Sequence, residues 1–103
     1  MAEKKDEVER PIEYVLTHSI QAYGEEVKVI RMRKPNGGDL IRAGNPLIFY
    51  PHCEPVKFEH DYAKLAVMIA RLSDVPSSSL SNLSSEDMAG LAWTLSPFFM
   101  APN

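Results

Sequence analysis

The chain has 103 residues, of which 45% are hydrophobic and 24% charged, a size and composition typical of one soluble globular domain. Its net charge is −3, and the segment after Lys34 holds four basic and seven acidic residues, so we expect no nucleic-acid partner, because such a partner needs a basic face. The single cysteine, Cys53, excludes an internal disulfide. No apolar run is long enough for a signal peptide or a membrane span. Together these features indicate a cytoplasmic protein without a membrane partner.

The first part of the chain is predicted to be a disordered tail followed by a β-hairpin. Residues 1–11 alternate in charge and contain one branched apolar residue, whereas residues 12–103 are expected to form a single domain. The hairpin spans residues 12–33, because two segments with strand-like alternation flank a turn at Gly24. The alternation slips near Val29, which indicates either a bulge there or burial of both faces; we favour burial, with a helix covering one face.

The middle of the chain is rich in glycine and proline. Gly37 and Gly38 follow the hairpin, and Asp39 is expected to cap a short helix that Gly44 closes. Residues 44–58 contain three prolines and are predicted to form a long loop, and loops of this length tend to be functional. Within this loop, the apolar residues 47–50 are a candidate for a short edge strand.

Two main helices are predicted, at about residues 60–74 and 84–96, with a short helical turn between them. The first is apolar around most of its circumference, which is typical of a central helix covered on more than one side. Ser84 is expected to cap the second helix, with Asp87 completing a capping box. The inner stripes are predicted to hold Tyr62, Leu65, Ala66, Ile69 and Leu72 in the first helix and Met88, Leu91, Ala92 and Leu95 in the second. The predicted fold class is therefore α+β, an N-terminal antiparallel β-hairpin packed on a C-terminal helical hairpin.

Several large apolar side chains fall outside these stripes. Trp93 lies about 140° from Met88 around the last helix, and an apolar tail follows Pro97. One interpretation is that the tail docks on the core, and the other is that these residues line a groove for the amphipathic helix of a partner. The candidate partner-binding residues are Trp93, Phe98, Phe99 and Met100, with Phe49 and Tyr50 of the loop as a second group.

No pattern in the sequence predicts a catalytic site, a metal site or a cofactor. His52, Cys53 and His60 lie near acidic residues, but their spacing fits no zinc site, and no motif supports a thiolate pair of Cys53 with a histidine. The Gly37–Asp39 segment has backbone N–H groups for an anion, although a chain turn explains its glycines more simply. The last helix contains no Lys, Arg, Asn or Gln, so we do not expect it to read DNA.

Six short segments carry a family resemblance through their order and spacing. They are GEEV (24–27), IRMRKP (30–35), GDL (38–40), MIARLSDVP (68–76), LSSED (83–87) and FF (98–99). From about residue 16 to residue 99, the chain resembles the tail assembly chaperone family of long-tailed bacteriophages and prophages. The resemblance implies a small non-enzymatic protein that keeps the helical tape measure protein soluble while tail tube subunits polymerise, in the cytoplasm of the bacterial host. The alternative is a structural minor tail subunit that is retained in the virion.

Overall fold

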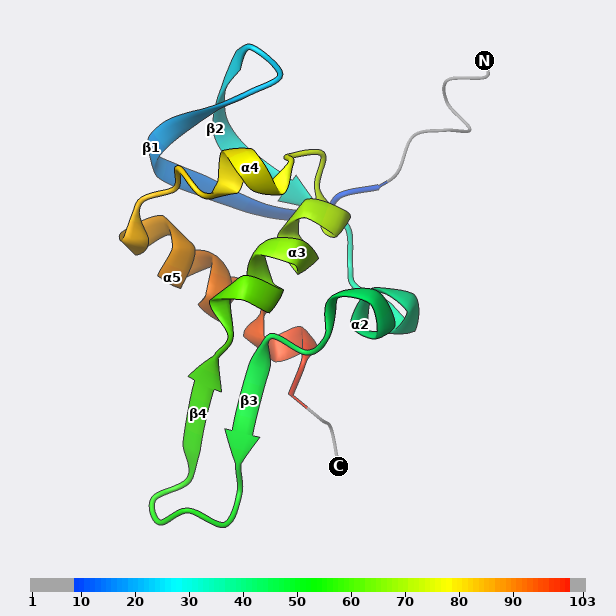
Figure 1. Ribbon diagram of the computed structural model, residues 1–103, viewed down its shortest axis with the longest axis vertical. Helices are drawn as coiled ribbons and strands as arrows, with labels where there is room; N and C mark the ends of the chain where they lie inside the picture. The colour runs from blue at the N-terminus through cyan, green and yellow to red at the C-terminus, as the bar shows by residue number, and fades with distance from the viewer. Residues whose placement is uncertain (1–8, 101–103) are drawn as a thin grey trace.

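The computed structural model describes residues 9–100, so the first eight residues of the predicted disordered tail lie outside the described range. The α+β prediction is confirmed: an antiparallel β-hairpin lies against several helices, and a second hairpin projects from the opposite end (Figure 1). The elements are β1 (Ile12–Ala22), β2 (Glu25–Met32), α2 (Gly37–Ala43), β3 (Leu47–Tyr50), β4 (Lys57–His60), α3 (Tyr62–Leu72), α4 (Ser77–Leu80), α5 (Ser85–Leu95) and the 3-10 turn η1 (Ser96–Phe98). Among the described helices, none has both the length and the apolar character needed to cross a membrane.

The irregularity of the first hairpin lies in β1, opposite the slip that the sequence shows in β2. Val15 pairs with Val29 and Ile20 pairs with Val27, so four residues of β1 lie opposite one residue of β2. The sequence offered a bulge near Val29 or burial of both faces, and we favoured burial. The pair is in fact bulged, but the extra residues belong to β1 and not to β2. A helix layer covers the inner face of β2 nevertheless, since Ile30 and Met32 have no exposed surface.

Asp87 at the start of α5 binds the bulged segment of β1. Its carboxylate oxygens accept the N–H of Thr17 at 3.0 and 3.1 Å, the Thr17 hydroxyl at 3.1 Å and the N–H of His18 at 3.3 Å. Burial alone raises the pKa of the Asp87 carboxyl, but these donors outweigh burial and hold the pKa below its ordinary value. Ser84 caps α5 as predicted, whereas Asp87 does not complete the capping box, because its carboxylate binds the bulge.

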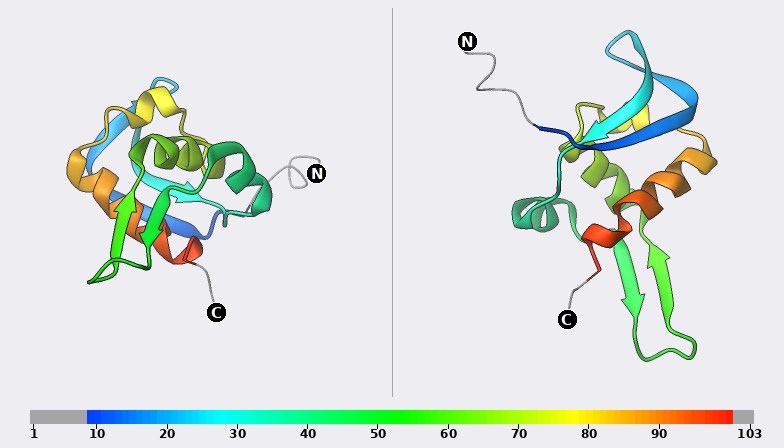
Figure 2. Two further views of the ribbon diagram at one scale, coloured as in Figure 1. Left: turned by 60° about the horizontal axis from the view of Figure 1, so that its bottom comes forward. Right: turned by 180° about the vertical axis from the view of Figure 1, so that it is seen from behind.

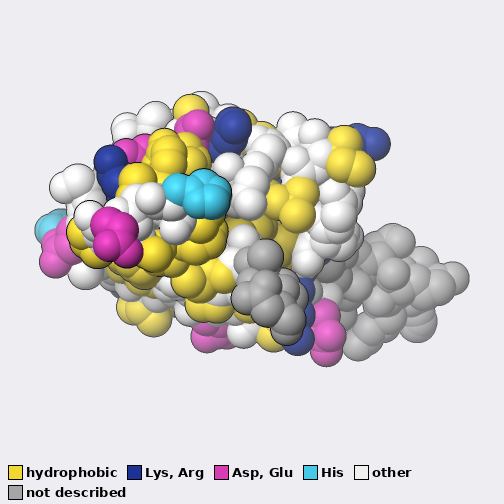
Figure 3. All heavy atoms as spheres, turned by 90° about the horizontal axis from the view of Figure 1, so that it is seen from below, with side chains coloured by type: hydrophobic (Ala, Val, Ile, Leu, Met, Phe, Trp, Pro, Cys, Tyr) yellow, Lys and Arg dark blue, Asp and Glu magenta, His cyan; other side chains and the backbone are white. Residues whose placement is uncertain are grey.

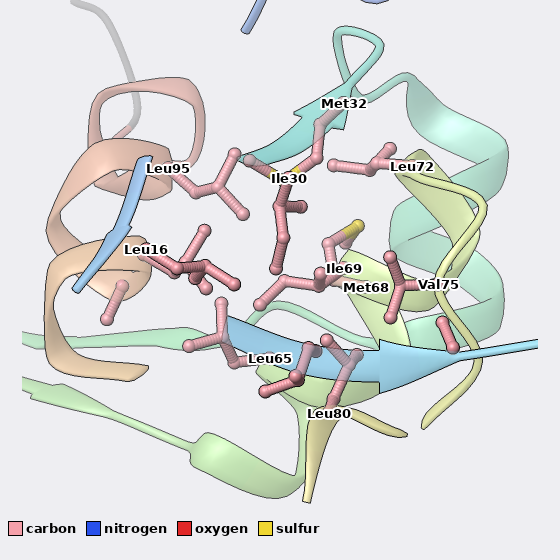
Figure 4. Packing of buried hydrophobic residues seen from close by; sticks show 14 residues of the cluster. Leu16, Ile30, Met32, Leu65, Met68, Ile69, Leu72, Val75, Leu80 and Leu95 are labelled. Carbon is pink, nitrogen blue, oxygen red and sulfur yellow. The ribbon is translucent and has the colours of Figure 1, made fainter. Parts of the chain in front are cut away.

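The hydrophobic core lies between the first hairpin and the helices α3 and α5 (Figure 4). The central helix is α3, which contacts α2, α4, α5 and β2. Its inner face differs from the prediction at two positions: Met68 is fully buried, whereas Tyr62 is 45% exposed because it lies in the first turn, at the edge of the core. The fully or nearly fully buried apolar side chains include Leu16, Ile20, Ile30, Met32, Leu65, Met68, Ile69, Leu72, Leu91 and Leu95.

The short helix α2 is held by a buried carboxylate. Its N-cap is Asn36 and not Asp39, because the helix begins at the glycines; Asp39 is the third helical residue and accepts the N–H of Asn36 at 2.9 Å. The Asp39 carboxylate, which has no exposed surface, also accepts two bonds from Arg33 at 2.7 and 2.8 Å and one from Arg71 at 3.1 Å. These bonds, the Arg33 pair above all, hold the pKa of Asp39 far below its usual range. The carboxylate of Asp39 therefore occupies the N-terminus of α2, where the sequence had suggested that an external anion could bind.

The predicted loop 44–58 is a second β-hairpin with a shorter loop. The apolar segment β3 pairs antiparallel with β4, as a two-stranded sheet separate from β1–β2. The predicted edge strand at residues 47–50 is confirmed as β3. Its partner β4 was missed, because β4 has only four residues, two of them charged, in a segment with three prolines. This hairpin projects from the helices, as both views in Figure 2 show, and the radius of gyration of 14.7 Å exceeds the value of about 13 Å for a compact chain of this length.

Candidate partner-binding surface

The exposed face of the second hairpin carries a pair of aromatic rings. Phe49 and Phe58 lie directly opposite each other across the two strands, and their rings stack with centroids 4.8 Å apart. Their side chains remain 51% and 39% exposed. Because alternate residues of a strand share a face, Leu47 and His60 lie on the same side of the hairpin as this pair.

His60 links the hairpin to α5. Its ring packs against the ring of Trp93 in a T-shaped arrangement, with centroids 5.0 Å apart, and lies 6.0 Å from the ring of Tyr62. Trp93 is 64% exposed, although indole is among the side chains that gain most from burial. We call Phe49, Phe58, His60 and Trp93 the aromatic row. Hydrophobic side chains gather in the centre of the face at this end of the molecule (Figure 3).

A shallow hollow continues the apolar surface beyond the aromatic row. It has a volume of about 590 Å³, and it is open to solvent. Tyr62 and Ala89 join the hollow to the row, since Tyr62 lies beside His60 and Ala89 lies one helical turn before Trp93. The hollow is lined by Tyr62, Leu80, Ser81, Leu83, Ser85, Met88 and Ala89.

The hairpin is fixed at its base, so the aromatic row has a defined position. The N–H of Asp61, the N-cap of α3, donates to the carbonyl of Pro46 at 2.7 Å, and Leu47 is buried. At the other side of the row, Thr17 and His18 in the bulge of β1 donate hydrogen bonds to the carboxylate of Asp87, and these bonds orient α5. Gly90 allows α5 to lie close to β1, because a Cβ at this position would overlap the hydroxyl of Tyr14.

The predicted binding residues are divided among several surfaces. Trp93 and Phe49 belong to the aromatic row, but Tyr50 lies on the opposite face of the hairpin, where its hydroxyl donates to Glu59 at 3.3 Å. Phe98 and Met100 are 43% and 46% exposed beyond the end of α5. Phe99 is half-buried and packs against the core. Phe99 therefore fits the interpretation that the tail docks on the core, whereas Phe98 and Met100 remain accessible to a partner.

The sequence did not identify Phe58, His60 and Tyr62 as members of this surface. A signal was present, since Phe58, His60 and Tyr62 recur at every second position, but the prolines around them favoured a loop. Cys53 is exposed in the turn of the second hairpin. Within residues 9–100, no three His, Cys, Asp or Glu side chains come close enough together to hold a metal ion.

A comparison with known protein families shows which family the chain is similar to. Residues 13–100 match the family described as "Phage tail assembly chaperone proteins, E, or 41 or 14". The chain belongs to the phage tail assembly chaperone family. No curated protein and no solved structure matches the chain. Membership implies that this chaperone has protein partners in tail assembly, and families of this kind are typically non-enzymatic.

Proposed function

We propose that this chaperone binds helical segments of the tape measure protein, and tail tube subunits as a second partner, in the cytoplasm of the bacterial host during tail assembly. It acts by reversible binding and carries out no catalysis. The aromatic row is the main contact surface, with the adjoining hollow as a receptor for an apolar side chain of the partner. Phe98 and Met100 extend the contact, whereas Tyr50 and Phe99 contribute little, because they lie on the far face of the hairpin and in the core.

The observation that carries this proposal is that His60, on the same face of the hairpin as the Phe49–Phe58 pair, contacts the ring of Trp93 in α5. Tryptophan and other aromatic side chains dominate the binding free energy at protein interfaces, and each buries about 150–250 Å² when it is fully covered. An apolar surface that combines aromatic rings with a hollow is typical of a groove that receives an amphipathic helix. Such a surface also suits a chaperone, because a few contacts of this kind give binding that can later be reversed.

The proposal is tested by co-expression with the tape measure protein. We expect the native chain to keep the tape measure protein in the soluble fraction, and Trp93→Ala and Phe49→Ala to reduce that fraction severalfold. Tyr23→Ala is the matched control, since Tyr23 is an aromatic residue, 79% exposed, in the turn of the opposite hairpin. The proposal is wrong if the tape measure protein remains insoluble with the native chain.

The alternative role is tested on purified virions. A chaperone leaves the particle after assembly, whereas a structural minor tail subunit stays in it. We expect mass spectrometry of mature virions to detect tail tube subunits and not this chain. Detection of the chain in stoichiometric amounts would assign it to the tail structure.

A further inference from the structure

We infer that the segment bound by the aromatic row is an amphipathic helix whose apolar stripe is flanked by lysine or arginine. This inference rests on the proposed function and adds the chemistry of the partner. It follows from the charges that border the row and the hollow. Electrostatic complementarity of this kind selects partners and raises association rates, even where each charge pair adds little affinity.

Three carboxylates border the apolar surface. Glu86 is exposed and lies seven residues before Trp93, so it is on the same side of α5, about 20° away. Glu54 is exposed in the turn of the second hairpin, and Asp61 lies between His60 and Tyr62 at the base. Among residues 9–100, none of these three carboxylates forms an ion pair with a cation.

The lysines of β4 and of the first turn of α3 are directed elsewhere. Lys57 lies on the opposite face of the hairpin, where it pairs with Glu59 at 3.1 Å and lies over the ring of Tyr50. The side chain of Lys64 lies against Gly44, about 3 Å from where a Cβ would stand. The segment 85–98, which forms α5 and η1, contains no basic residue. An incoming helix therefore meets unneutralised negative charge around an apolar centre.

The same charges argue against two other occupants. A second copy of the chain, related by a twofold axis through the row, would bring the acidic border of one copy, formed by Glu54, Asp61 and Glu86, against the acidic border of the other. A helix flanked by acidic residues would meet the same repulsion, and like charges at an interface disfavour binding. A helix with basic flanks neutralises the three carboxylates while its apolar stripe covers the row.

The test uses two synthetic helical peptides without tryptophan. They share one apolar stripe and differ only in the flanking positions, which hold lysine in one peptide and glutamate in the other. Trp93 is the only tryptophan of the chain, so its fluorescence reports binding at the row directly. We expect the lysine peptide to bind about tenfold more tightly at low salt, the combined effect of charge pairs with the exposed Glu54 and Glu86 and the half-buried Asp61, and this preference to shrink as salt screens the charges.

Charge variants of the protein decide whether the named carboxylates are responsible. We expect Glu54→Gln with Glu86→Gln to remove most of the preference for the lysine peptide. Glu25→Gln is the matched control, because Glu25 is an exposed acidic residue at the turn of the first hairpin, and it should leave the preference unchanged. Equal affinity for the two peptides would overturn the inference. An emission shift that grows with protein concentration in the absence of peptide would also overturn it, in favour of a second copy.

Failure of this inference is distinguishable from failure of the proposed function. If the native chain solubilises the tape measure protein but binds both peptides equally, the function stands and the charge preference is wrong. If the lysine peptide is preferred but the tape measure protein stays insoluble, the surface has the inferred chemistry and a different partner.

Discussion

The two β-hairpins of this chaperone differ in what covers their apolar faces. In β1–β2, Ile30 and Met32 have no exposed surface, because α3 and α5 pack on them. In β3–β4, Phe49 and Phe58 remain half exposed, and no element of residues 9–100 covers them. An isolated two-stranded hairpin is only marginally stable in water, so the second hairpin depends on its anchored base and on its stacked aromatic pair. A partner helix across the aromatic row would give the second hairpin the cover that α3 and α5 give the first.

The comparison predicts that substitutions near the covered hairpin destabilise the protein, and among its polar contacts the largest effect is expected at Asp39. Asp39→Ala leaves Arg33 and Arg71 without their shared anion and removes the acceptor of the Asn36 N–H, which is one half of the capping box of α2. We expect a loss of about 3 kcal/mol in the free energy of unfolding, measured by urea denaturation. Asp74→Ala is the control: its carboxylate is 81% exposed and pairs only with Arg10 among residues 9–100, so its loss should be below about 1 kcal/mol. Equal effects of the two substitutions would contradict the assigned role of Asp39.

Gly90→Ala is predicted to cause the next largest loss of folding stability. At an ordinary helical position this change stabilises by about 1 kcal/mol, but here the new methyl group meets the ring of Tyr14. We expect a loss of about 2 kcal/mol, because the ring must shift or α5 must move away from β1. In a Tyr14→Ala background the same substitution should become stabilising. If Gly90→Ala stabilises the native background too, the close packing of α5 on β1 is wrong.

The stability of the covered half should also depend on acid pH. Asp39 and Asp87 both have pKa values below the usual range, so their bonds contribute full stability above the unfolded pKa of about 4. This contribution is lost as the pH falls through the lower pKa values that the two carboxyls have in the folded state. We expect the native chain to lose about 1 kcal/mol or more between pH 5 and pH 3, and Asp87→Asn to lose less over the same interval. An identical pH profile for Asp87→Asn would show that the bulge contact contributes nothing.

The smallest predicted effect on folding is at the open face. Trp93→Ala removes a mostly exposed side chain whose main ring contact is His60, so the free energy of unfolding should change by less than about 1 kcal/mol. Leu91→Ala, two residues away and fully buried, should cost about 2–5 kcal/mol. Comparable losses for the two would mean that Trp93 belongs to the core and not to a binding surface.

The sequence was sufficient to predict the covered half of the fold. The first hairpin and the helices α3 and α5 follow from alternation and helical periodicity, which are local properties of the chain. The bulge in β1 did not follow, because the carboxylate that binds it comes from Asp87, about 70 residues further on. The cap of α2 was misplaced because two capping residues, Asn36 and Asp39, are three residues apart and the sequence does not say which begins the helix.

The candidate site was predicted only in part for a similar reason. Trp93 and Phe49 are recognisable as large apolar residues outside the helical stripes, but their relation depends on the register of β3 with β4. That register places Phe58 beside Phe49 and brings His60 to the base of the hairpin, where it meets α5. Tyr50, the neighbour of Phe49, faces the other way for the same reason, since side chains of a strand alternate between its faces.

The most direct test of the open face is the fluorescence of Trp93 in the presence of a tryptophan-free helical segment of the tape measure protein. If this segment covers the aromatic row, the emission maximum of Trp93 shifts to shorter wavelength as the complex forms, and Phe49→Ala with Phe58→Ala weakens the titration while Tyr23→Ala does not. A complex that forms, as judged by size-exclusion chromatography, with no change in Trp93 emission would show that the partner binds elsewhere and that the row is not the binding surface.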